Sequence, residues 1–175
     1  AERTFTANAN KMTIPLTYAL NASELAGTTT VVFESLYSDG IPLVSHADLT
    51  DAEQTVYIPK IHTTAKDKIT GINHTESAKT ATIIDTVFYT NLLPNRSYVV
   101  SGKLMNKATG KPILIGGKEV TASTTFTPTK AEGSVDVTFT FDATAVAPET
   151  VVAYETLSYK EIRVAAHEEI SDADQ

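Results

Sequence analysis

The sequence predicts an all-β fold of the β-sandwich type, and three observations lead to this prediction. Runs rich in Thr, Val, Ile, Phe and Tyr alternate apolar and polar residues with a period near two, as half-buried strands do. Turn-forming Gly, Pro and Asn residues separate these runs at short intervals. No long segment has the 3.6-residue periodicity of an amphipathic helix. Short strands at this spacing are typical of a sandwich.

The individual elements follow from the same patterns, taken along the chain. The clearest strand signals cover residues 82–89, 97–104 and 135–141. Turns are predicted at residues 38–40, 93–95, 108–112, 116–117 and 132–133. Only two short segments, residues 21–25 and 142–146, are plausible helical turns.

The chain also repeats itself. A shift of 121 residues places residues 1–54 on residues 122–175 without a gap, and 16 of the 54 pairs are identical. We therefore interpret residues 1–56 as the C-terminal part of one repeat whose front half is missing, and residues 57–175 as a complete repeat. Residues 55–60 are predicted to form a short extended connector, because Pro59 keeps its neighbour out of a helix.

Composition excludes several classes of function. The formal net charge of −7 argues against nucleic-acid binding, which needs clustered Lys and Arg. The absence of Cys removes disulfides, thiol nucleophiles and thiolate metal sites. No apolar stretch is long enough to span a bilayer, so no membrane insertion is expected in this segment, and any targeting signal lies outside it. We expect no cofactor and no metal.

The repeated polar residues are the candidates for chemistry. A Glu is followed by His after twelve residues, by Asp after five more and by Gln after a further three. Two carboxyl groups and an imidazole near a primary amide favour acyl transfer at that amide, with a Thr or Ser hydroxyl as nucleophile. The alternative is a set of structural hydrogen-bonding residues. The two copies are Glu34, His46, Asp51 and Gln54, and Glu155, His167, Asp172 and Gln175.

Several segments together resemble the Thr–Gln ester-bond domains, or VaFE-type repeats, of Gram-positive cell-surface adhesins. Beyond the two His/Asp/Gln tails, they are residues 31–34, 59–65, 84–92, 102–105, 124–128 and 152–155. The resemblance implies an immunoglobulin-like sandwich whose first and last strands become covalently joined. In such a domain a Thr hydroxyl attacks a Gln side-chain amide and ammonia is released.

Carried onto this sequence, the resemblance implies a nucleophile at Thr63 or Thr64 and an acceptor at Gln175, assisted by Glu155, Asp172 and His167. Thr63 is preferred because it shares a strand face with Ile61, which should point into the core. A proton shared by Glu155 and Asp172 is expected to polarise the amide. The Thr that would partner Gln54 is not found, so Gln54 is predicted to be unlinked within this chain. Asp85 is expected to be a structural hydrogen-bonding group, and a place near the Glu155 site is the alternative.

The predicted function is a structural stalk segment of an adhesin, displayed outside the cell on a cell-wall-anchored parent. Its partners are neighbouring repeats of the same polypeptide, and any host-surface ligand is bound through other domains. Cross-linking would be a single autocatalytic event, so no turnover enzyme is predicted. One alternative is a plain immunoglobulin-like ligand-binding module without a cross-link. Another is a hydrolase using Thr63, His167 and Asp172, but no nucleophile-elbow motif supplies an oxyanion hole.

Overall fold

The computed structural model describes residues 1–174 and is nearly all strand. The predicted all-β class is therefore confirmed. Both predicted helical turns are present as short 3-10 helices, each begun by a side chain that caps a backbone N–H. The elements in order are η1 (Ala22–Leu25), β1 (Thr29–Val31), β2 (Glu34–Ser38), β3 (Ile41–His46), β4 (Thr55–Tyr57), β5 (Lys60–Asp67), β6 (Ala81–Thr90), β7 (Tyr98–Asn106), β8 (Lys111–Pro112), β9 (Leu114–Ile115), β10 (Lys118–Glu119), β11 (Thr121–Phe126), β12 (Gly133–Phe141), η2 (Ala143–Ala145), β13 (Val151–Tyr159) and β14 (Ile162–His167).

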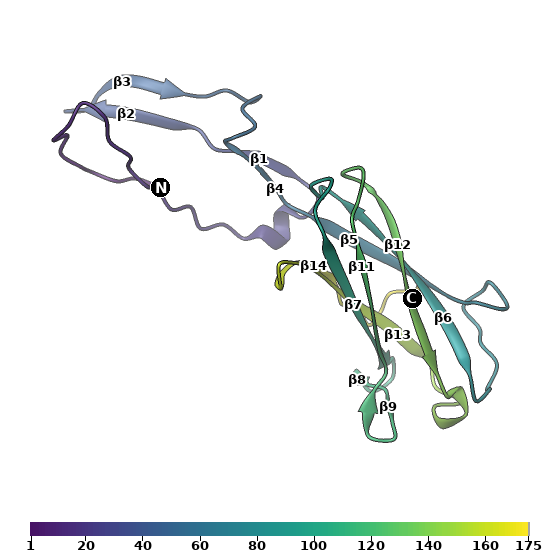
Figure 1. Cartoon of the computed structure of the whole chain (residues 1–175). Helices are drawn as coiled ribbons and strands as arrows, with labels where there is room; N and C mark the ends of the chain where they lie inside the picture. The colour runs from purple at the N-terminus through teal and green to yellow at the C-terminus, as the bar shows by residue number, and fades with distance from the viewer. Residues whose placement is uncertain (175) are drawn as a thin grey trace.

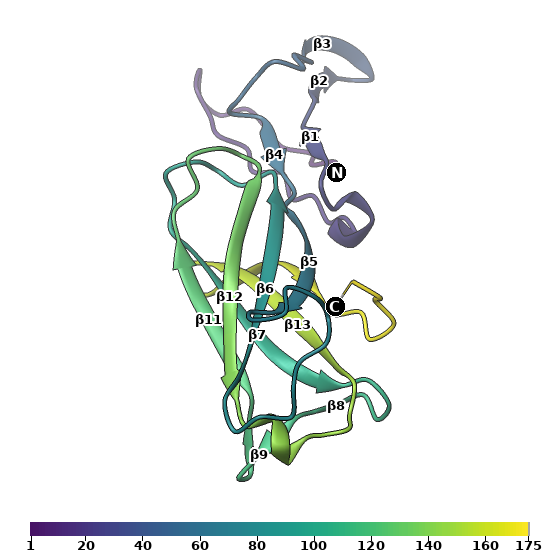
Figure 2. The same cartoon turned by 90° about the vertical axis from the view of Figure 1, so that its right-hand side faces the viewer.

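Two antiparallel sheets form a sandwich from β5 onward (Figures 1 and 2). One sheet has the strand order β12-β6-β5. The other has the order β11-β7-β13-β14, with the short β8 paired to β7. The first strand, β5, and the last strand, β14, belong to different sheets but lie against each other at one edge of the sandwich. The two ends of this unit are thereby neighbours in space.

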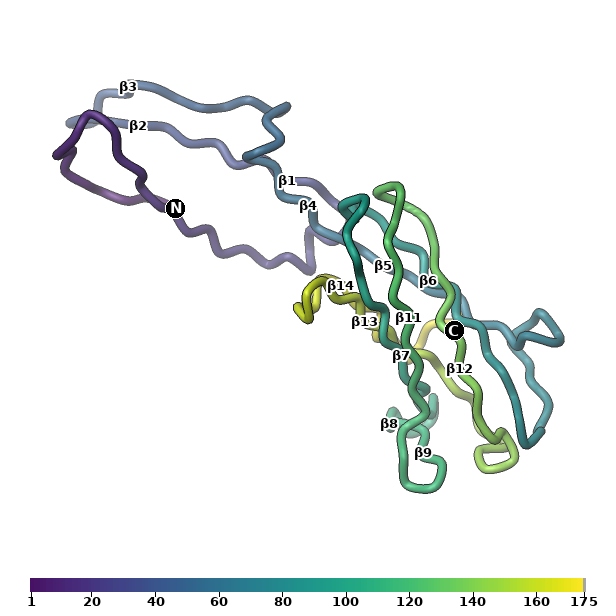
Figure 3. The backbone as a smooth tube through the Cα atoms, in the orientation of Figure 1, coloured from purple at the N-terminus to yellow at the C-terminus, as the bar shows by residue number. Residues whose placement is uncertain are grey.

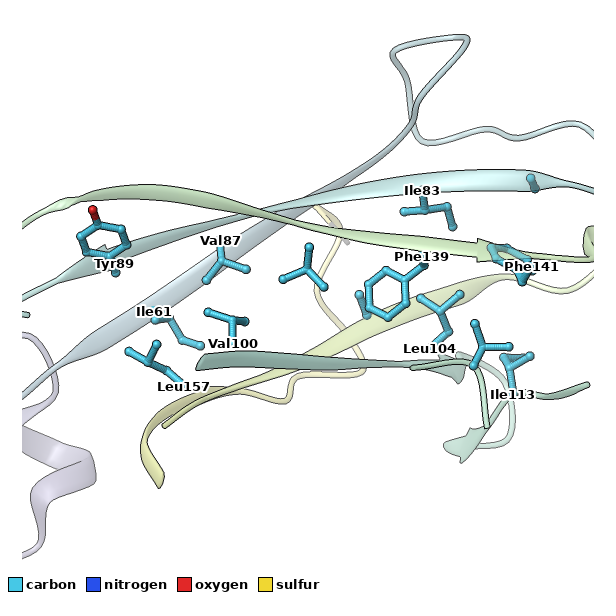
Figure 4. Packing of buried hydrophobic residues seen from close by; sticks show 14 of the residues in the cluster. Ile61, Ile83, Val87, Tyr89, Val100, Leu104, Ile113, Phe139, Phe141 and Leu157 are labelled. Atoms are coloured by element: carbon cyan, nitrogen blue, oxygen red, sulfur yellow. The ribbon is translucent and has the colours of Figure 1, made fainter. Parts of the chain in front are cut away.

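The core lies between the two sheets, and strict alternation builds it. Every second residue of β6 is buried, so one face of the strand points into the core and is apolar except for Asp85, while the other face is half-buried. Val87, Val100, Phe139 and Leu157 come from four different strands and are fully buried in one cluster (Figure 4). Complete burial of such a side chain stabilises the fold by about 1.5–3 kcal/mol.

Residues 1–58 form no comparable core. They run away from the sandwich as a thin, open segment (Figure 3), with β1 paired to β4 and β2 paired to β3. The predicted connector is extended, and its first part is β4. Backbone hydrogen bonds between Gly27, Thr28 and Ile58 join this segment to the start of the sandwich. The division into an incomplete and a complete repeat stays a prediction.

The β2–β3 hairpin nevertheless has the same pairing as the β13–β14 hairpin. Glu34 faces His46 just as Glu155 faces His167, and each register slips after the third pair. Adding 121 to the residue numbers of each β2–β3 pair gives the corresponding β13–β14 pair, so the two hairpins share one register. The local sequence alone specifies this hairpin, since one copy is packed in a sandwich and the other is not.

Candidate functional site

Four polar side chains are buried among residues 1–174, and three of them, each on a different strand, meet inside the sandwich, while the fourth, Asp67, lies at the end of β5. Thr63 on β5 is 2% exposed, while Asp85 on β6 and Glu155 on β13 have no exposed surface. Burying polar groups costs free energy unless they find partners, so their presence among Val and Phe side chains calls for a specific role. Asp85, for which a structural role was expected and a place near Glu155 was the alternative, is a neighbour of Glu155 and belongs to the site.

Thr63 faces inward, as the alternation with Ile61 predicted. Ile61 and Thr63 are both buried, whereas Thr64 is only half-buried on the other face of β5. The Thr63 hydroxyl donates a hydrogen bond to Glu155 Oε2 over 3.3 Å. The contact brings together two residues 92 positions apart in the sequence. The hydroxyl thus meets a carboxyl group in an environment from which bulk water is excluded.

Glu155 holds its proton at neutral pH. Burial, followed by a hydrogen bond and charge repulsion from Asp85, raises the pKa of Glu155 to about 10. The Thr63 hydroxyl opposes this rise slightly. The carboxyl neighbour of Glu155 is therefore Asp85, which corrects the expectation that Asp172 would share its proton. Two buried carboxyl groups in contact cannot both ionise cheaply, so the pair carries a transferable proton.

Gly102 makes room for this carboxyl group. It lies opposite Glu155 in the β7–β13 pairing. A Cβ at Gly102 would stand 2.6 Å from Phe139 Cζ and 3.2 Å from Glu155 Oε1. Only glycine leaves space there for both side chains. Gly102 lies in residues 102–105, one of the segments that carry the family resemblance, but the sequence did not indicate this steric role.

Asp172 instead pairs with His167, at the edge of the sandwich. Their Nε2 and Oδ2 atoms are 2.6 Å apart, and both side chains are less than one-fifth exposed. A hydrogen bond from the Asp174 backbone N–H, with further support from His167 and Lys107, lowers the pKa of Asp172. Asp172 is an ionised partner that orients the imidazole beside the end of β14.

The residues after β14 return to the strand that carries Thr63. The backbone N–H of Ala65 donates to the carbonyl oxygen of Asp174 over 2.9 Å. Ala65 is two residues beyond Thr63 on β5. Gln175, the predicted acceptor, lies outside the described residues, but the chain is brought to this edge one residue before it.

The first copy assembles only the local part of this arrangement. His46 Nε2 and Asp51 Oδ2 are 2.7 Å apart, and a backbone N–H from Glu53 contributes most to the lowered pKa of Asp51. The His46 side chain is 53% exposed, against 17% for His167. Among the described residues β2 pairs only with β3, so no Thr-bearing strand lies beside Glu34.

Two negative findings concern residues 1–174. No group of three or more His, Cys, Asp or Glu side chains there is arranged to hold a metal ion. No helix in that range is long and apolar enough to cross a membrane.

Comparison with known proteins adds a family and a fold. The model of the T-Q ester bond containing domain matches residues 1–58 and again residues 59–175. Among curated proteins, none matches the chain. Two crystal forms of a bacterial adhesin from Mobiluncus mulieris, which contains intramolecular disulfide, isopeptide and ester bond cross-links, are similar in fold. Both have a TM-score of 0.53 over 67% of this chain, with 17% and 18% identity. The match spans 55% of the adhesin's length.

Proposed function

This chain belongs to the family of T-Q ester bond containing domains, and on that premise we propose that Thr63 and Gln175 become joined by an ester bond that strengthens a segment of a surface adhesin. The observation that carries the proposal is the buried Thr63 hydroxyl, hydrogen-bonded to Glu155 beside Asp85. A plain sandwich gains nothing from three buried polar groups at one point of its core.

The reaction is an acyl transfer that balances without a cofactor. The Thr63 oxygen attacks the side-chain carbonyl carbon of Gln175, the carbon–nitrogen bond breaks, and the nitrogen leaves as ammonia. The carboxyl pair takes the hydroxyl proton and returns a proton to the departing nitrogen. Because the raised pKa keeps Glu155 protonated at neutral pH, the acid is available where it is needed. The His167–Asp172 pair supports the acceptor end of the chain.

The reaction occurs once per molecule, so the chain is a self-modifying structural protein rather than a turnover enzyme. The family membership, together with the fold shared with a bacterial adhesin, supports a stalk segment displayed on a Gram-positive cell surface. Its parent is anchored to the cell wall, and neighbouring repeats of the same polypeptide are its immediate partners. A cross-link also supplies the mechanical strength that a chain without Cys cannot obtain from disulfides.

The test is the intact mass of the purified chain beside two variants. We expect the parent to be lighter than its sequence mass by one ammonia and Thr63→Ala to have its full sequence mass. Thr64→Ala is the matched control, because it also removes a Thr hydroxyl from β5 but on the opposite face of the strand. This variant should lose one ammonia as the parent does. A parent at full sequence mass, or a Thr63→Ala variant that still loses ammonia, would refute the proposed bond.

A further inference from the structure

Besides the pair of Asp172 with His167, two polar contacts hold the loop that leads to Gln175 against the sandwich. One is the hydrogen bond from the backbone N–H of Ala65, on β5, to the carbonyl oxygen of Asp174. The other comes from Lys107, in the turn after β7, whose Nζ donates to the carbonyl oxygen of Asp172 over 2.8 Å. The Lys107 backbone N–H in turn donates to Thr150 O over 2.9 Å, which fixes the base of the side chain next to β13.

Packing contributes little at this place. Lys107 and Ala173 line an open cavity of about 470 Å³ together with Ala65, Leu104 and Ala153. The loop residues therefore face open space rather than a filled core, and Ala173 and Asp174 are exposed. A loop so placed is held by its hydrogen bonds, and a bond from a charged donor is stronger than one between neutral groups.

The first copy shows which contacts the loop makes by itself. Asp51 binds His46 and the Glu53 N–H there, just as Asp172 binds His167 and the Asp174 N–H. These bonds form although β2 and β3 pair only with each other among the described residues, so the bonds are local to the hairpin and its loop. The contacts from Lys107 and Ala65 belong to the complete sandwich alone. The loop therefore folds through its local bonds, and the contacts from Lys107 and Ala65 attach the folded loop to the sandwich at β5.

We propose that Lys107 is a positioning residue for the cross-link, holding the acceptor loop at Asp172 so that Gln175 is presented to Thr63. This inference rests on the proposed ester bond. Lys107 contacts the backbone of the loop at Asp172. It acts by fixing the backbone three residues before Gln175, while the Ala65 bond fixes the backbone one residue before it. Two points of attachment, at Asp172 and at Asp174, fix the backbone of the loop that leads to Gln175.

The first experiment measures the rate of linkage. Parent and variant chains are made by cell-free synthesis, sampled at timed intervals, and their loss of one ammonia is followed by intact mass. Lys107→Met keeps the aliphatic stem but removes the donor and the charge, and we expect roughly tenfold slower linkage. Lys107→Arg should stay close to the parent. Lys111→Met is the matched control, because Lys111 is exposed on the adjoining β8, and it should link at the parent rate.

The second experiment separates positioning from general stability. In a Thr63→Ala background no bond forms, and hydrogen exchange at the Ala65 amide reports the docking of the loop directly. Adding Lys107→Met should speed exchange at Ala65 about tenfold and leave core amides such as that of Val87 unchanged. Equal effects on both amides, or linkage of Lys107→Met at the parent rate, would overturn the positioning role. A parent that never loses ammonia would overturn the ester bond itself, and the exchange experiment would still decide how the loop is held.

Discussion

At the scale of single residues, the site depends on a carboxyl group that stays neutral because of where it lies. Glu155 is fully buried beside Asp85, and its pKa is raised from 4.5 to about 10. Below pH 4.5 the group is protonated in the folded and unfolded states alike. Between pH 4.5 and 10 only the folded state keeps the proton, so folding takes up a proton and stability falls as pH rises.

This argument predicts the pH dependence of the unlinked chain. In Thr63→Ala, where no ester masks the effect, the urea midpoint should fall steadily from pH 5 to pH 9. Adding Glu155→Gln removes the titrating group and keeps the shape, so that variant should lose less stability over the same range. Equal slopes for the two chains would show that Glu155 titrates normally and has no place as the acid of the reaction.

Individual site residues were also harder to predict from the sequence than the fold was. Alternation along β5 was enough to choose Thr63 over Thr64, because one period-two pattern decides which side chain points inward. The repeated spacing singled out His167 and Asp172 as candidate site residues, and the structure places them in hydrogen-bond contact. The spacing could not identify Asp85, because a shift of 121 residues places the equivalent position before residue 1 and leaves no pair to compare. Contact between β6 and β13 depends on how two sheets face each other, and no local pattern records it.

At the scale of elements, the hairpin is autonomous but the site is not. Both hairpins share one register, and both hold the same His–Asp hydrogen bond. The second copy alone adds β5 and β6, which bring the hydroxyl and the second carboxyl group. The short connector and both helical turns were also predictable, since Pro59 and the capping residues Asn21 and Asp142 act locally.

The two Gln residues should therefore behave differently although their surroundings in sequence match. Gln175→Ala should restore the full sequence mass, whereas Gln54→Ala should lose one ammonia as the parent does. The physical reason is that Thr63 lies inside the sandwich, hydrogen-bonded to Glu155, whereas within residues 1–174 no strand with a buried Thr pairs with β2, which carries Glu34. Peptide mapping of the parent should find Gln54 unmodified. A parent that loses two ammonia molecules would contradict this assignment.

At the scale of the whole molecule, the ester would turn the sandwich into a closed loop. Residues 63 and 175 are 112 positions apart in the sequence. By analogy with disulfides, closing a loop of that length stabilises the folded state by about 4–5 kcal/mol through the entropy of the unfolded chain. That amount is a large share of the 5–15 kcal/mol typical of a domain. The thin segment of residues 1–58 lies outside the loop and gains nothing from it.

Mechanical strength follows from the same geometry and is the sharpest prediction for the whole chain. When force is applied between the two ends, it enters the sandwich through β5 and leaves through the residues after β14, which lie side by side. With the ester formed, the load passes from Thr63 to Gln175 through covalent bonds, and the loop between them cannot extend. Thr63→Ala should instead release roughly 370–400 Å of chain, at about 3.3–3.6 Å per residue. Single-molecule pulling measures this difference directly, with Thr64→Ala as the control that should stay as short as the parent. Equal extensions for the parent and Thr63→Ala would mean that force unfolds the sandwich in both, and that no covalent bond spans it.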